Sequence, residues 1–361
     1  VVNDTISPTG FGPTNIAVDP DPYEAVTGYA GNNITILQGG SFVNQFALDP
    51  SCVHPLKVRV MQGTSTTGPT STFFVIACEN NEVQIYVFDQ SLSTFTKKSS
   101  QTIVNLRGIF TTFGDDGTGK NLVVASGGAS GETGVVTEIF TIDQSTGTLN
   151  PPVSDTPVNG ANDAVGGISG NSGLAFVAEA NSVSIYSENN TTGALGSSPL
   201  FTQPDPGDPV ALGFKADPFL FVANAGLNQV DAFGVNTSTG ALTPVSGSPF
   251  AVGGEPVAVA IADNKFLYTA NARDGTVSAF SLNASSGALT QIPGSPFAAG
   301  GEPFSLAVDP SGASLYVLNA ADNNLSPFSI NTSTGVLTQG ISAAFPAPLS
   351  GANLSFIATT P

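Results

Sequence analysis

Residues 255–301 read EPVAVAIADNKFLYTANARDGTVSAFSLNASSGALTQIPGSPFAAGG, and close copies of this stretch lie before it and after it in the chain. Pro209, Pro256 and Pro303 mark three successive copies and recur at intervals of 47 residues. A fixed period of this length indicates one supersecondary unit that is repeated along the chain.

Each copy reads as four short strands separated by turns. In residues 255–301 the expected strands are 257–261, 266–270 and 277–282, and a fourth begins at residue 288. Asn, Asp, Ser and Gly fill the intervals, as they do in turns. The strands are apolar on both faces, which suits sheets that pack between two neighbours. Four strands in each 47-residue repeat predict the blade of a β-propeller.

Weaker copies of the unit lie upstream, at residues 175–195, 121–149, 73–95 and 23–42. Together with the three clear copies they make seven units. The sequence therefore predicts an all-β fold, a seven-bladed β-propeller of four-stranded antiparallel blades that forms a single domain over residues 1–361.

The two ends of the chain supply one strand too many. Residues 14–18 could begin the first blade, and residues 352–360 form an eighth candidate for an innermost strand. We expect the ring to close by pairing of the chain ends, which would displace the segment up to Val18. A displaced strand can add to the sheet edge of another molecule, so a homo-oligomer or filament built through residues 1–12 is one hypothesis. The alternative is that the extra strand packs on its own molecule.

Composition excludes several classes of partner. Nine Lys and Arg against 27 Asp and Glu give a formal net charge of −18, which disfavours nucleic acids and anionic membranes. No apolar run approaches the roughly 18 residues that span a bilayer, so no membrane insertion is expected. A chain that begins at Val1 is consistent with a processed, secreted protein. We therefore expect an extracellular or cell-surface location.

The two cysteines fit this expectation. Cys52 precedes the innermost strand of the second blade, and Cys78 ends the next strand. These positions are adjacent in an antiparallel hairpin, so we predict a Cys52–Cys78 disulfide.

Asn-x-Ser/Thr sequences are candidates for glycosylation if a eukaryote secretes the protein. The turn in which three of them recur also favours Asn for its own geometry, which leaves an incidental origin open. The candidate acceptors are Asn3, Asn33, Asn190, Asn236, Asn283 and Asn331.

The units at residues 208–340 resemble the YVTN-type repeats of the lactonase-like seven-bladed propellers. That family includes 6-phosphogluconolactonase, carboxymuconate-cyclising enzymes and many exported propellers without an assigned activity. The resemblance implies an active site at one mouth of the central channel, built from His and Arg on the segments that enter each innermost strand. In this chain the entry positions are Gly12, His54, Arg107, Asp163, Asp208, Glu255 and Glu302.

Lactone hydrolysis needs a general base for water and a positive or hydrogen-bonding group for the oxyanion. His54 is the candidate base and Arg107 the candidate electrophile. The alternative is that His54 caps a strand and Arg107 pairs with a neighbouring acid.

The entry positions of the last four blades carry carboxylates where the enzymes carry further His and Arg. Asp163, Asp208, Glu255 and Glu302 would repel one another at a shared mouth unless they bind protons or a cation, and oxygen ligands suit Ca²⁺. The alternative is that each points to solvent. With one His and no Cys-x-x-Cys pair, a zinc site is not expected, nor is an organic cofactor.

Two classes of function remain open. The first is a non-catalytic secreted propeller that binds an extracellular ligand, forms a surface or assembles with itself. The second is a lactone-acting enzyme with His54 and Arg107 at the channel mouth. The scarcity of cationic side chains favours the first.

Overall fold

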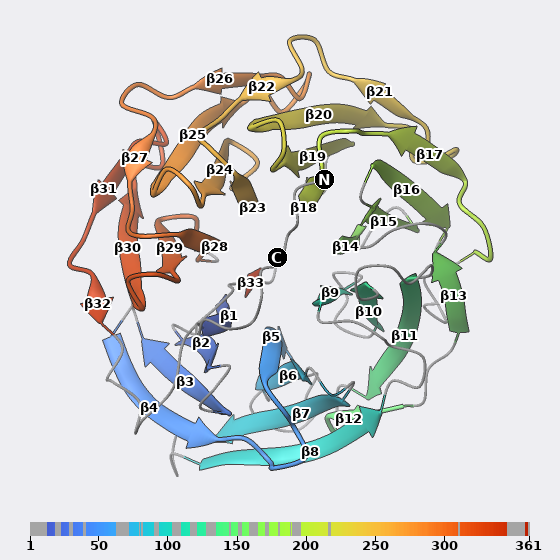
Figure 1. The fold of residues 1–361 in the computed structure, drawn as a ribbon, viewed down its shortest axis with the longest axis vertical. Coiled ribbons are helices and arrows are strands. Elements are labelled where there is room, and N and C mark those ends of the chain that lie inside the picture. Colours follow the sequence, from blue (N-terminus) through green and yellow to red (C-terminus); the bar gives the residue numbers. More distant parts are fainter. Residues whose placement is uncertain are drawn as a thin grey trace.

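The structure is a computed structural model. It consists of seven sheets arranged around a ring (Figure 1), and neighbouring strands along the chain pair antiparallel within each sheet. The seven-bladed propeller is therefore confirmed. The described residues are 13–18, 23–28, 32–38, 41–62, 72–78, 80, 82–89, 94–102, 110–115, 121–127, 135–143, 146–150, 154–158, 165–169, 173–179, 181–187, 189, 196–215, 218–309, 311–344 and 358–359.

Blades one to four follow one another around the ring. Blade one contains β1 (Pro13–Val18), β2 (Tyr23–Gly28), β3 (Asn33–Gln38) and β4 (Ser41–Ala47). Blade two contains β5 (Pro55–Gln62), β6 (Thr72–Cys78), β7 (Glu82–Asp89) and β8 (Thr94–Thr102). Blade three contains β9 (Phe110–Asp115), β10 (Asn121–Gly127), β11 (Val135–Asp143), β12 (Thr148–Leu149) and β13 (Ser154–Val158). Blade four contains β14 (Val165–Ser169), β15 (Leu174–Glu179), β16 (Ser182–Ser187) and β17 (Phe201–Pro204).

Blades five to seven are the three clear repeats. Blade five contains β18 (Pro209–Lys215), β19 (Phe219–Asn224), β20 (Gln229–Val235), β21 (Leu242–Pro244) and β22 (Phe250–Ala251). Blade six contains β23 (Pro256–Ala262), β24 (Phe266–Asn271), β25 (Thr276–Leu282), β26 (Leu289–Gln291) and β27 (Phe297–Ala298). Blade seven contains β28 (Pro303–Val308), β29 (Ser314–Asn319), β30 (Asn324–Ile330), β31 (Leu337–Gln339) and β32 (Ala343–Ala344). A last strand, β33 (Ala358–Thr359), follows blade seven.

The fourth strand of the repeat differs from the sequence-based expectation because it is split in two. In blade six, β26 and β27 both pair with β25. The segment between them carries two prolines, which cannot donate to a ladder. Between the two short strands, Ser295 Oγ accepts the backbone N–H of Ala279 at 2.8 Å, which leaves this N–H of β25 with a partner.

The expected displacement of the first strand is wrong. β1 pairs with β2 in blade one, so residues 13–18 are not displaced from it. The short β33 instead adds in parallel to the inner edge of β1, where Ala17 lies opposite Ala358. Both ends are thus paired within one molecule, in a way that leaves all four strands of blade one in place. Residues 1–12 lie outside the described residues, and self-assembly through them stays a prediction.

The hydrophobic core lies between the blades rather than inside any one of them. Between blades six and seven, for example, Tyr268 and Val277 of one sheet form a single buried cluster with Leu315 and Val317 of the next. Blades four and five share a similar cluster. This explains why the strands are apolar on both faces: each sheet buries one face against the blade before it and the other against the blade after it.

The outer hairpin of several blades is docked onto the preceding blade through a glycine. In the turn of blade seven, Asn331 Oδ1 accepts the N–H groups of Ser333 and Thr334, and Gly335 follows with a φ of 72°. A Cβ on each of these glycines would lie within about 3 Å of an apolar side chain of the blade before, so only glycine fits. The contacts join Gly147 to Phe73, Gly240 to Ile185, Gly287 to Phe219 and Gly335 to Phe266.

The part of the chain that the structure describes forms no helix, and so none long and apolar enough to cross a membrane.

Candidate functional site

The entry positions share an unusual backbone conformation. His54, Asp208, Glu255 and Glu302 have φ values of 48°, 58°, 57° and 51°. Each precedes a proline, and that proline lies opposite the last residue of the next strand in all four blades. The structure therefore places His54 at the same position in blade two that the three carboxylates occupy in blades five to seven. Gly12, Arg107 and Asp163 lie outside the described residues.

The left-handed conformation is unfavourable for these residue types, by about 1–2 kcal/mol each. Hydrogen bonds hold it in place: the carbonyl of Glu255 accepts the N–H of Ala272 at 2.9 Å, and the carbonyl of Glu302 accepts that of Ala320 at 2.8 Å. Such strained positions are often functional, which makes this mouth of the ring a candidate site.

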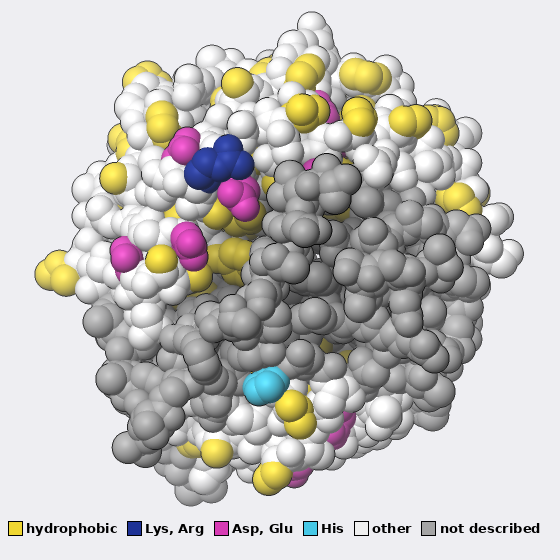
Figure 2. Space-filling model, in the orientation of Figure 1, with side chains coloured by type: hydrophobic (Ala, Val, Ile, Leu, Met, Phe, Trp, Pro, Cys, Tyr) yellow, Lys and Arg dark blue, Asp and Glu magenta, His cyan; other side chains and the backbone are white. Residues whose placement is uncertain are grey.

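The mouth is acidic over blades six and seven, where acidic side chains gather around a basic group (Figure 2). Glu255 Oε2 lies 3.5 Å from Nε of Arg273. Asp274 and Asp322 accept the N–H groups of Gly254 and Gly301, at 2.6 and 2.7 Å.

The described carboxylates do not converge as a metal centre. Among described residues, no group of three or more His, Cys, Asp or Glu side chains could hold a metal ion. Asp208, Glu255 and Glu302 are thus separate groups on the ring, and Glu255 has Arg273 as its cationic partner. Calcium binding that includes Asp163 stays a prediction.

A second cluster, between blades four and five, was not anticipated from the sequence. Asp205 follows β17 and is only 3% exposed, and Asp231 lies on β20. The fully buried Asn224 donates from Nδ2 to Oδ2 of Asp205 at 3.4 Å and also to Oδ2 of Asp231. These carboxylates border a cavity of about 250 Å³ that Pro204, Leu227 and other side chains line.

Burial sets the ionisation of this pair. Loss of water raises the pKa of the Asp205 carboxyl above its usual range. Loss of water also raises the pKa of Asp231, and the charge of Asp205 adds to that shift. A repeat alignment contained the signal, because Asp231 stands where blades six and seven have Ser278 and Ser326, whose hydroxyls bond the equivalent Asn.

Replacing Asp231 with serine should stabilise the protein at neutral pH. A raised carboxyl pKa means that the folded state binds more protons than the unfolded state, so stability falls as the pH rises above the ordinary value of about 4. Asp231→Ser removes this loss, and Asn224 keeps a partner. The difference in melting temperature between variant and wild type should grow from pH 3 to pH 7, roughly across the range that brackets that ordinary value. A difference that is constant with pH would contradict the assignment.

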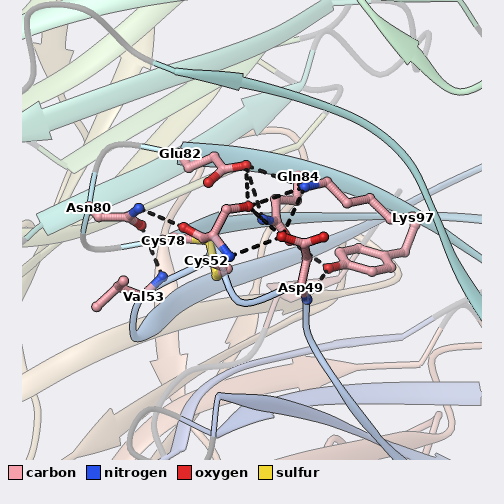
Figure 3. The surroundings of a disulfide bond; sticks show 10 residues. Asp49, Cys52, Val53, Cys78, Asn80, Glu82, Gln84 and Lys97 are labelled. Carbon is pink, nitrogen blue, oxygen red and sulfur yellow. Dashed lines mark hydrogen bonds and ion pairs between the residues drawn. A yellow bond between two sulfur atoms is a disulfide. The ribbon is translucent and has the colours of Figure 1, made fainter.

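The predicted disulfide is present. Cys52 and Cys78 are bonded with a Cα–Cα distance of 5.3 Å, and both are 1% exposed. Figure 3 shows the bond tying the segment between blades one and two to the end of β6. Asn80 bonds the same segment, because its Nδ2 donates to the carbonyl of Ser51 at 2.7 Å.

A polar network lies beside the disulfide (Figure 3). Lys97 Nζ is 3.4 Å from both Asp49 Oδ1 and Glu82 Oε1, and it donates to Ser51 Oγ at 3.2 Å. Hydrogen bonds from Ser51 hold the pKa of Asp49 below its usual range. Burial raises the pKa of Tyr86, which accepts the N–H of Asp49, to about 12. Lys97 thus links two carboxylates and a hydroxyl beside the disulfide.

The candidate glycosylation sites fall in two groups. Asn236, Asn283 and Asn331 are exposed at equivalent outer turns, and Asn33 is half-buried at the start of β3. Asn3 and Asn190 lie outside the described residues, and modification of any site stays a prediction.

Comparison with known proteins bears on the fold and the family. Residues 255–350 match the family model described as Lactonase, 7-bladed beta-propeller. The resemblance to lactonase-like propellers is confirmed. No curated protein matches this sequence.

Several solved structures share the fold. A candidate 6-phosphogluconolactonase from Bacteroides fragilis is 19% identical with a TM-score of 0.66, and the match covers 88% of this chain and 92% of that one. The periplasmic gluconolactonase of Pseudomonas aeruginosa is 17% identical with a TM-score of 0.66, over 91% and 95% of the chains. A functionally unknown protein from Desulfotomaculum acetoxidans is 16% identical with a TM-score of 0.65, over 91% and 96%. At these identities the likeness concerns the fold alone.

Proposed function

We propose that the protein is a lactone hydrolase that works at the mouth of the central channel, with His54 as its general base. The observation that carries this proposal is the position of His54, which enters the innermost strand of blade two in the strained conformation shared by the other described entry residues. The match of residues 255–350 to a lactonase family supports it. These findings favour the enzyme over the non-catalytic module that the shortage of cationic side chains suggested.

The chemistry assigns one task to His54. Its neutral imidazole takes a proton from water while the water oxygen bonds to the acyl carbon of the lactone. The ring C–O bond then breaks, and the departing alkoxide oxygen takes the proton back from the imidazolium. The product is an open-chain hydroxy acid. Arg107 is the proposed donor to the oxyanion of the tetrahedral intermediate.

The charges at the mouth point to an uncharged substrate. The acidic residues Asp208, Glu255 and Glu302 share the entry geometry of His54, and each precedes the proline that begins the innermost strand of its blade. A phosphate dianion would meet repulsion there, and Arg273 is the basic partner of Glu255. We therefore propose neutral sugar lactones as the substrate class.

The test compares wild type with His54→Asn on glucono-δ-lactone. Asparagine tolerates a left-handed φ, so this variant keeps the backbone and removes the base. We expect kcat/KM to fall by about 100-fold or more, which is the usual contribution of a general base. The melting temperature should remain that of the wild type.

Two results would contradict the proposal. Unchanged turnover in His54→Asn would remove His54 from the chemistry. A wild type that hydrolyses no member of a lactone panel would favour a non-catalytic extracellular module. The specific observation that supports such a module is that the 361 residues include a single His.

A further inference from the structure

Because the blades are repeats of one unit, the residues beside the linker that enters each blade can be compared at equivalent positions. The space beside this linker, next to the third and fourth strands, is called the crevice below. Beside the inter-blade linker, an aromatic residue on the third strand pairs in register with one residue of the fourth strand. These pairs are Tyr86 with Lys97, Phe233 with Pro244, Phe280 with Gln291 and Phe328 with Gln339. The residue that pairs with the aromatic is therefore the one that can reach into the crevice.

In blade two that residue is a lysine, and its ammonium contacts two carboxylates and a hydroxyl. Lys97 Nζ lies 3.4 Å from Glu82 Oε1 and from Asp49 Oδ1, and 3.2 Å from Ser51 Oγ. Ser51 stands four residues before the entry proline Pro55. The fold thus holds a primary ammonium group at this place with carboxylate and hydroxyl oxygens.

In blade seven the same position is filled by a neutral side chain. Gln339 Nε2 donates to the carbonyl of Ala299 at 3.1 Å and to Ser326 Oγ at 3.4 Å. Ala299 stands four residues before Pro303, as Ser51 does before Pro55. The positions of Asp49 and Glu82 hold Phe297 and Asn324 in this blade, so neither the acids nor the cation of blade two is present there.

Blade five also has two acids at this place, at the positions of Ser51 and Gln84 rather than of Asp49 and Glu82, but it lacks a lysine at the position of Lys97. Asp205 stands four residues before Pro209, and Asp231 occupies the position of Gln84 and Ser326. The position of Lys97 is taken by Pro244, which lines the cavity but carries no hydrogen-bond donor. The cavity has a volume of about 250 Å³.

The two carboxylates in this cavity have hydrogen-bond donors but no counter-charge. Asp205 Oδ1 accepts the N–H of Gly207 at 3.2 Å, and Gln229 Nε2 donates to Asp231 at 3.3 Å. Within the described ranges, no Lys or Arg pairs with either acid. Oδ1 of the fully buried Asn224 has no hydrogen-bond partner. Buried charge of one sign is unfavourable unless a partner neutralises it.

The geometry points to a binding site for a primary alkylammonium group in the cavity between blades four and five, held by Asp205 and Asp231. The bound ammonium would occupy the place that Lys97 Nζ takes in blade two. The site is separate from the channel mouth and does not depend on the proposed lactonase activity.

The lining favours an alkylammonium over a divalent metal. Ca²⁺ takes six to eight oxygen ligands, whereas these carboxylates are two, and no larger group of metal-binding side chains is found in the described part of the chain. An ammonium has three donors for carboxylate oxygens. The remaining walls include Pro204, Leu227 and Phe233, which suit an aliphatic stem.

The test is calorimetric titration of the full chain with n-pentylamine at pH 7, with 1-pentanol as the neutral probe of equal length. Wild type should bind the amine and not the alcohol. Asp231→Ser, which installs the residue of blades six and seven, should weaken amine binding at least tenfold. Asp263→Asn removes an exposed carboxylate elsewhere and should leave binding unchanged.

A second variant tests the comparison between blades. Pro244→Lys places a lysine at the position of Lys97, and its tethered ammonium should occupy the cavity and abolish binding of pentylamine. The same variant should raise the melting temperature. Equal binding of 1-pentanol and pentylamine, binding that survives Pro244→Lys, or calcium binding with the same dependence on Asp231 would each overturn the proposal.

A further arm distinguishes the sources of the ammonium. Nα-acetyl-lysine N-methylamide presents a protein lysine, and pentylamine a free amine. Tighter binding of the lysine derivative would indicate recognition of a partner's lysine side chain, and tighter binding of pentylamine a small amine ligand; either supports the site.

Discussion

Gly335→Ala should lower the free energy of unfolding by about 3 kcal/mol, the sum of a left-handed alanine and an overpacked contact. The residue has a φ of 72°, which disfavours any side chain. A Cβ there would lie 2.4 Å from Cδ1 of both Ile292 and Phe266. Phe266 is buried in the core between blades six and seven, so it can yield only by disturbing that packing.

Denaturant unfolding followed by circular dichroism measures this effect. Gly234→Ala is the matched control, because the nearest atom to its new Cβ is the carbonyl oxygen of Thr243 at 3.7 Å and its backbone is not left-handed. The control should change stability by less than about 1 kcal/mol, since alanine in a strand differs little from glycine. Equal losses in both variants would show that the docked turn is not a determinant of stability.

Removing the disulfide with Cys52→Ala and Cys78→Ala together should cost about 3 kcal/mol, as expected from the loss of a cross-link that closes a loop of this length. The cysteines are 26 residues apart, and both are buried. The bond joins the linker between blades one and two to the end of β6, so its loss frees the segment that carries His54.

The measurement is the melting temperature with and without a reducing agent. The melting temperature of the wild type should fall when the protein is unfolded and refolded under reducing conditions. The melting temperature of the double variant should not change with the reductant. A wild type that melts at the same temperature in both conditions would mean that the covalent bond adds nothing to the packing of blade two.

The sequence predicted the blades well because strand and turn signals are local. The expected strand at residues 266–270 is β24, which ends at Asn271, and that at residues 277–282 is β25, which begins at Thr276. The split fourth strand was missed because it depends on Ser295 bonding a neighbouring strand. The placement of β33 was missed for a related reason: a two-residue parallel pairing with β1 leaves no periodic pattern.

The candidate site residues show the same difference between features that depend on local sequence and features that depend on packing. The entry positions His54, Asp208, Glu255 and Glu302 could be located because a proline follows each of these four residues. The repeat alignment marks Asp231 as unusual, but its pairing with Asp205 could not be located, because the pairing depends on which side chains meet across a gap between sheets. Lys97 likewise meets Asp49 only because the two blades are neighbours in space.

The glycine contacts of the outer turns all point the same way around the ring, from a later blade to the blade before it. Four of the described outer hairpins place a glycine on the blade made before them, as Gly287 does on Phe219 and Gly335 on Phe266. During synthesis from the N-terminus, each of these hairpins therefore finds its receiving surface already built. A chain released by the ribosome before blade seven would leave Phe266 and Ile292 uncovered, an apolar surface on which chaperones and proteases could distinguish the unfinished product from the finished one.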